Sequence, residues 1–138
     1  MGSMGVDVER TTVNPWPWSV GFGFNQGEVV SGQSRTLFCA GQGATDAGGR
    51  PVHEGDMAAQ VELSVANLEA VLAAAGMSLS DVVRLTVYTT DVDVLLEHYG
   101  VLTGRLRAAG VATAMTLLGV QRLAFPSMLV ELEATAVA

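Results

Sequence analysis

The sequence predicts an α+β domain with one mixed β-sheet and two helices packed on one face of it. Stretches rich in β-branched and apolar residues alternate with two segments whose apolar residues recur every three or four positions. The order is ββ, α, β, α, ββ, which implies one layer of strands and one layer of helices. At 138 residues the chain is long enough for a single domain with a buried core.

The N-terminal residues contribute little to this fold. Residues 1–4 are interpreted as a cloning remnant and the initiator methionine, which leaves 5–138 as the domain. The segment 14–18, NPWPW, is expected to be extended because each proline disfavours helical geometry in the residue before it. Its two residues Trp16 and Trp18 are interpreted as packing anchors, with ligand stacking as the alternative.

Two strands should follow, and then the first helix. Residues 27–32 and 35–42 have the pattern of strands that pair as a hairpin or a bulged ribbon. Asp56 can cap the helix and Gly76 can end it. The apolar stripe between them consists of Val61, Val65, Leu68 and Leu72.

The second half of the chain repeats this alternation. Residues 81–91 are predicted to form a strand, and a second helix should run from about Asp93 to Ala109, before Gly110. The stripe of this helix consists of Leu95, Tyr99, Leu102 and Leu106. Residues 114–124 and 129–137 are the closing strands.

The overall charge limits the classes of partner. Seven basic and fourteen acidic residues give a net charge of −7, which is unfavourable for binding phosphates, so no nucleic-acid partner is expected. No apolar run has the length of a membrane span, and no signal peptide is recognisable, so we expect no membrane partner. The single cysteine, Cys39, favours a reducing compartment, and we expect a cytoplasmic protein.

The apolar strands suggest a second copy of the chain. The stretches TLFCAG (36–41) and MTLLGV (115–120) are apolar at nearly every position, which is typical of strands buried on both faces. Two helices can cover only one face. We therefore expect homo-oligomerisation, with another copy covering the other face.

The last strand carries two acids on one face. In LVELEATAV (129–137), Val130, Leu132 and Ala134 alternate with Glu131 and Glu133. Neighbouring carboxylates repel each other and resist burial. The pattern raises the question of which cation balances them.

Several of these stretches together resemble the RidA/YjgF family, whose name stands for reactive intermediate deaminase. They are GFNQG (23–27), CAGQ (39–42), the segment 60–91 and the closing RLAFPSMLVELEATAV (122–137). The resemblance implies a chorismate-mutase-like fold and a homotrimer with small-molecule clefts between subunits. It also implies hydrolysis of enamines and imines to a keto acid and ammonia, without cofactor or metal.

The resemblance assigns individual positions. It places the water-activating glutamate at Glu131 and the pocket glycine at Gly41. Phe24 stands where the family has a tyrosine, Met115 where it has the arginine that binds the substrate carboxylate, and Leu117 where it has a cysteine. The chain thus keeps the carboxylate and lacks its cation, and we expect the pKa of Glu131 to be raised, with Glu133 contributing.

Three further residues are candidates from elsewhere in the sequence. Arg35 and Arg122 are candidates for the missing cation, and His98, beside Tyr99, for an acid–base group in a neighbour's pocket. Two functions follow from the resemblance: an imine or enamine hydrolase with altered substrate preference, or a non-catalytic small-ligand-binding or regulatory trimer. With two histidines and one cysteine, no metal site is expected.

Overall fold

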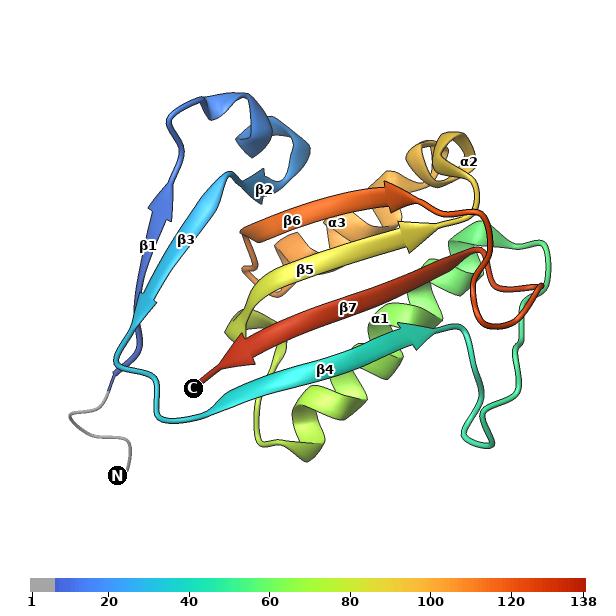
Figure 1. The fold of residues 1–138 in the computed structure, drawn as a ribbon, viewed down its shortest axis with the longest axis horizontal. Helices are drawn as coiled ribbons and strands as arrows, with labels where there is room; N and C mark the ends of the chain where they lie inside the picture. The colour runs from blue at the N-terminus through green and yellow to red at the C-terminus, as the bar shows by residue number, and fades with distance from the viewer. Residues whose placement is uncertain (1–6) are drawn as a thin grey trace.

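The computed structural model describes residues 7–138 and has a main sheet of five strands with helices behind it (Figure 1). The expected remnant at 1–4 lies outside the described residues. The strands are β2 (Phe24–Asn25), β4 (Thr36–Gly43), β5 (Val82–Thr89), β6 (Thr113–Gly119) and β7 (Val130–Val137), in the spatial order β2-β6-β5-β7-β4. The central strand β5 is parallel to β6 and antiparallel to β7, so the sheet is mixed as predicted.

The first helix, α1 (Met57–Ala74), begins and ends where the sequence predicts. The carboxylate of Asp56 accepts a hydrogen bond from the backbone N–H of Ala59 at 3.0 Å, and Gly76 follows the helix with φ +73°. Its stripe of Val61, Val65, Leu68 and Leu72 is buried against β4 and β7. By length and composition alone this one helix of residues 7–138 could cross a membrane, but its buried stripe makes it the core helix of the domain.

One polar side chain of α1 fixes two loops. Gln60 is 1% exposed, and its amide nitrogen donates to the carbonyl oxygens of His53 and Ser127. Its amide oxygen accepts from the backbone N–H of Leu129 at 2.8 Å. Because all these groups are paired, a buried amide is tolerated here and holds the start of β7 in place.

The second predicted helix is divided into two. Helix α2 (Val92–Glu97) and helix α3 (Tyr99–Ala108) meet at His98, whose φ of −112° and ψ of 15° depart from helical values. Gly100 and Gly104 weaken helix propensity just after the break. The stripe is nevertheless continuous, because Leu95, Leu102 and Leu106 are all buried.

The pairing predicted for the first strands is wrong. Strand β3 (Gly27–Ser31) pairs with β1 (Glu9–Val13), a strand that the sequence did not reveal, in a separate two-stranded sheet. Strand β4 instead pairs antiparallel with β7, and the backbone N–H groups of Ser34 and Arg35, just before β4, donate to the carbonyl of Ala138, just after β7. Pairing with β7 allows β4 to bury Cys39 in the core, which the local hairpin would not do.

Two other boundaries also differ from the prediction. Pro17–Phe22 forms a short 3-10 helix, η1, because proline is tolerated in the first turn of a helix, where its missing N–H is not needed. Trp16 is 61% exposed and Trp18 59% exposed, so neither is a packing anchor in the single chain. Strand β6 ends at Gly119 rather than at residue 124.

The sheet has one open face, on the side away from the helices (Figure 1). The expectation that its strands are apolar on both sides is only partly met. Phe38 is 81% and Leu118 44% exposed on this face, but the central strands place polar side chains there. The polar side chains are Arg84, Thr86, Tyr88, Thr116, Glu131, Glu133 and Thr135.

Candidate functional site

Glu131 lies on the open face of the sheet, in contact with the backbone of Gly41. Its neighbours along β7, Val130 and Leu132, are buried on the helix side, so alternation directs the carboxylate outward. A Cβ at position 41 would lie 2.6 Å from the carboxyl carbon of Glu131. A side chain at position 41 would displace the carboxylate from this position, so the structure brings together these two residues that the family resemblance pairs.

The environment of Glu131 disfavours its charged form. The residue is half-buried, and loss of hydration raises the pKa of its carboxyl, with repulsion from Glu133 as the second cause. The expected direction of this shift is thus confirmed. Tyr88 lies opposite Glu131 on β5, and its hydroxyl donates to Glu133 at 2.8 Å. This bond to the ionised Glu133 is the main reason that the pKa of Tyr88 is raised.

Replacing Gly41 by alanine should displace the carboxylate of Glu131. We expect a change of no more than about 0.5 kcal/mol in the free energy of unfolding, because position 41 is exposed and the end of the flexible Glu131 side chain can rotate away. Gly104→Ala is the comparison with an unhindered Cβ: nothing lies within 4 Å of it, and alanine inside a helix should stabilise the fold by about 0.5–1 kcal/mol. Chemical denaturation of both variants measures the effect, and a loss of more than about 2 kcal/mol in Gly41→Ala would show that the carboxylate of Glu131 is held rigidly over the glycine.

Three other predicted site residues gather at the β2–β6 edge, on the helix side of the sheet. Met115 is aligned with the buried Leu85 of β5 and Leu117 with the buried Val87, so both side chains point toward the helices. Phe24 pairs with Thr113 at the start of the same strand. Met115 and Leu117 pack against the core, and no cation occupies either position.

These residues do not meet Glu131 within one chain. Met115 and Leu117 lie on the helix side of β6, whereas Glu131 and Gly41 lie on the open side of β7 and β4, with β5 between the two groups. Neighbouring strands are about 4.8 Å apart, so β6 and β7 are separated by roughly 10 Å. The chain therefore presents two half-sites on opposite faces of its sheet.

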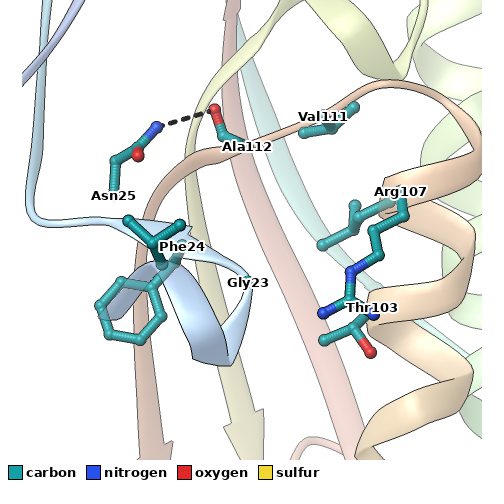
Figure 2. A pocket seen from close by; sticks show the side chains of 9 residues that line it. Gly23, Phe24, Asn25, Thr103, Arg107, Val111 and Ala112 are labelled. Atoms are coloured by element: carbon teal, nitrogen blue, oxygen red, sulfur yellow. Dashed lines mark hydrogen bonds between the residues drawn. The ribbon is translucent and has the colours of Figure 1, made fainter. Parts of the chain in front are cut away.

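Two hollows adjoin Phe24 on the helix side. The larger is an aromatic groove of about 540 Å³, lined by Trp18, Phe22, Phe24, Val92, Leu96, Tyr99 and Leu117. The smaller, of about 130 Å³, lies between α3 and the Gly23–Asn25 segment (Figure 2).

The smaller hollow contains a cation that the sequence did not suggest. The amide nitrogen of Asn25 donates to the carbonyl of Ala112 at 3.2 Å across its wall, while Arg107 extends back along α3 toward Thr103 (Figure 2). Among the described residues that line this hollow, Arg107 alone is charged. It thus shares a cavity with Phe24, on the opposite face from Glu131.

The other candidate residues lie elsewhere. Arg35 donates to the carbonyl of Ala75 at the end of α1, and its backbone bonds Ala138, at the opposite end of β7 from Glu131. Arg122 lies in the loop after β6 and donates to the carbonyl of Leu123 at 3.3 Å. His98 is half-buried at the junction of α2 and α3 and lines neither hollow.

Sequence reasoning missed Arg84 and Tyr88 on the open face, together with Arg107. The signal for the first two was available, because Arg84, Thr86 and Tyr88 alternate with Leu85 and Val87 along β5. Arg84 donates to the hydroxyl of Thr116 at 2.6 Å. Within residues 7–138, no cluster of three or more His, Cys, Asp or Glu side chains has the arrangement of a metal site.

Comparison with known proteins agrees with this architecture. A family model described as endoribonuclease L-PSP matches residues 22–138. A RutC family protein of Pyrococcus horikoshii is 34% identical over 103 residues, which cover 72% of this chain and 77% of that protein.

Solved structures show the same fold. The Rid-family protein YyfB of Yersinia pestis is 37% identical with a TM-score of 0.82, covering 94% of this chain and 98% of that one. TdcF of Escherichia coli, solved with bound serine, is 27% identical with a TM-score of 0.68, covering 83% of this chain and 87% of that one. The match over nearly all of the main sheet and its helices, together with the contact of Glu131 and Gly41, shows that the chain belongs to the RidA/YjgF family.

Proposed function

We propose that the protein is a cytoplasmic homotrimer that hydrolyses an imine or enamine in clefts between its subunits, without cofactor or metal. The observation that carries the proposal is the half-buried carboxylate of Glu131, held over the backbone of Gly41 with a raised pKa. A carboxyl group whose pKa is raised above its ordinary value is better suited to accept a proton from water and return it.

The placement of the half-sites supports the trimer. Phe24, Met115 and Leu117 face one side of the sheet, and Glu131 and Gly41 face the other. A complete site then requires the open face of one copy to approach the β2–β6 edge of the next. Such a head-to-tail contact closes into a ring, and a cyclic trimer is one of the arrangements it can form.

The proposed hydrolysis of an imine requires one protein group that accepts and returns a proton. Water adds its oxygen to the electrophilic imine carbon, and Glu131 accepts one proton from that water and returns it to the nitrogen, which gives a carbinolamine. Collapse of the carbinolamine forms the C=O bond and releases ammonia, so that R₂C=NH and H₂O become R₂C=O and NH₃. The carboxylate is ionised again at the end of the cycle.

The substrate preference should differ from that of arginine-bearing relatives. TdcF has been solved with bound serine, a ligand that carries a carboxylate. In this chain Met115 stands at the position of the carboxylate-binding arginine, and a thioether cannot bind a carboxylate by paired N–H donors. We therefore expect weak or absent hydrolysis of 2-aminoacrylate.

The second candidate is a non-catalytic, small-ligand-binding or regulatory trimer. It is favoured by the loss of two polar groups at once, since Phe24 also lacks the hydroxyl of the family's tyrosine. Screening imines of several classes for ammonia release separates the two functions. Ammonia release that depends on Glu131 supports the hydrolase, and ligand binding without any turnover supports the regulatory trimer.

Ribonuclease activity, which the family model's description names, is the weakest of the alternatives. A net charge of −7 opposes the approach of a polyanion. The open face also carries Glu131 and Glu133 side by side, which would repel a phosphate backbone.

Replacing Met115 by arginine should increase affinity for carboxylate substrates. Met115 is half-buried against the core and lines neither hollow, so the apolar stem of an arginine would have to follow the path of the thioether for its guanidinium to reach the proposed cleft. A hydrogen bond to a charged group contributes about 1.5–3 kcal/mol, so KM for 2-aminoacrylate should fall by roughly 10- to 100-fold. Met115→Gln is the matched polar control without charge. Equal KM values for the two variants would mean that position 115 does not face the substrate.

A further inference from the structure

The aromatic groove has walls from three separate parts of the chain. Its rings are in edge-to-face contact: Trp18 is 5.9 Å from Phe24 and 6.2 Å from Phe22 between ring centres, with interplanar angles of 85° and 75°. Helices α2 and α3 supply the opposite wall, and Leu117 of β6 supplies the floor. At about 540 Å³ the groove is within the range of small-molecule sites.

Among residues 7–138, none of the side chains that line the groove is charged. The hydroxyl of Tyr99 is the one titratable group among them, and it donates to the carbonyl of Phe22 at 3.1 Å, so it is already engaged. The flanking helix α2 carries acids and no base, in the sequence DVDVLLE (91–97). An anion in the groove would lose hydration without gaining a partner. A neutral or cationic group would avoid this cost, since aromatic rings attract cations.

Trp18, whose ring closes the groove, precedes the part of the chain that matches the family model. The family model matches residues 22–138, whereas Trp18 lies in η1, before that match begins. Trp18 is 59% exposed although it contacts two other rings. A large apolar side chain held in this way, beside the position of Phe24, is placed to contact a ligand rather than to fill a core.

We propose that the aromatic groove binds the planar apolar skeleton of a substrate that carries no carboxylate, as a neutral imine or its protonated iminium form. The inference rests on the proposed function and adds the substrate class. The groove takes over the anchoring role for which arginine-bearing relatives use a carboxylate contact. The groove adjoins Phe24 and Leu117, so a bound ring would place its imine carbon at the half-site that a second copy completes with Glu131.

Three ligands that share one ring test the charge preference. Benzyl alcohol, benzylamine and benzoate are titrated into the full-length protein at neutral pH by calorimetry, where they are neutral, cationic and anionic respectively. Benzyl alcohol and benzylamine should bind in the millimolar range or tighter, and benzoate at least tenfold more weakly. Equal or tighter binding of benzoate overturns the proposal, and so does the failure of all three to bind, which is expected if a second copy fills the groove.

The location of binding is tested by a matched pair of tryptophan variants. Trp18→Ala should weaken binding of benzyl alcohol at least tenfold, whereas Trp16→Ala, which removes an equally exposed ring outside the groove, should change it less than twofold. Equal effects of the two variants overturn the proposal. If Trp18→Ala fails to fold, Leu96→Lys tests the same groove. Leu96 is 53% exposed, so this substitution should be tolerated. A cation there should shift preference toward benzoate, and an unchanged preference also counts against the groove.

The failure of this inference is distinguishable from failure of the proposed function. Ring binding is measured by calorimetry and hydrolysis by ammonia release, so either can fail while the other succeeds. Ring binding that depends on Trp18, in a protein that hydrolyses no imine, supports the groove and contradicts the hydrolase. Hydrolysis of carboxylate-bearing imines that is unaffected by Trp18→Ala supports the hydrolase and contradicts the proposed role of the groove.

Discussion

Replacement of Glu131 by glutamine should abolish imine hydrolysis while leaving the protein at least as stable at neutral pH. Glutamine has nearly the same shape and fits over Gly41, but it cannot accept a proton from water. General-base catalysis contributes typically 10²- to 10⁴-fold, so the loss in kcat should be of that order. Ammonia release on any substrate found in the imine screen is the measurement.

The expected effect on stability follows from the direction of the pKa shift. Burial and Glu133 raise the pKa of Glu131 in the folded state above its ordinary value. Below the ordinary value the group is protonated in both states and costs nothing. As pH rises through the raised pKa, ionisation destabilises the folded state, and the full penalty is present above it. Removing the charge relieves this penalty at neutral pH, so the melting temperature should be unchanged or higher.

Glu133→Gln is the matched control on the same strand and face. It removes the charge that repels Glu131, so the acid limb of the pH–rate profile should move to lower pH while activity is retained. A clear loss of stability in Glu131→Gln with activity retained would identify Glu131 as a paired structural charge. If Glu133→Gln loses activity and Glu131→Gln keeps it, the catalytic base is Glu133 and not Glu131.

The elements that the sequence predicts well are those defined by local signals. Helix α1 lies between a capping Asp56 and a left-handed Gly76, and β7 alternates apolar and acidic residues, so both could be placed without tertiary information. The break at His98 could not, because the stripe of Leu95, Leu102 and Leu106 continues through it. Periodicity records which face is buried and does not show a change of direction between two short helices.

Pairing and exposure depend on distant parts of the chain. Strands β3 and β4 are neighbours in sequence, yet β4 pairs with β7, almost a hundred residues away, because that pairing buries Cys39 beside Ala134. For Trp18 the sequence favoured packing, with ligand stacking as the alternative. Composition favours buried tryptophan, and a ring that lines a groove has the same sequence signature as a ring in a core.

The sequence predicted which residues belong to the site, but not how they are arranged in space. Glu131 and Gly41 do meet, and Phe24 and Leu117 line one groove. Only the structure places these two pairs on opposite faces of the sheet. Since alternation along β6 and β7 could be read from the sequence, the missing information was the register across β5, which long-range pairing sets.

Replacement of Phe38 by glutamate should dissociate the proposed trimer and abolish the proposed hydrolysis, although Phe38 belongs to neither half-site. Phe38 is 81% exposed on the open face in one chain, which is unusual for a ring at the centre of a strand. Burying a phenylalanine contributes about 1.5–3 kcal/mol, and each subunit of a trimer would lose that contribution and gain a buried charge. Sedimentation of the variant at micromolar concentration measures the change in assembly, and Val29→Glu on the β1–β3 ribbon is the control with the same change in charge.

Mixed subunits test whether the site is shared between copies. Glu131→Gln and Phe24→Ala subunits are each expected to be inactive alone, since each damages a different half-site. If every site takes Glu131 from one subunit and Phe24 from the next, random mixing of the two variants in equal amounts should restore about a quarter of the sites. If both residues act within one chain, mixing restores none. A monomeric wild-type protein with full activity would contradict the trimer and the shared cleft together, because Glu131 and Phe24 would then act from opposite faces of one sheet.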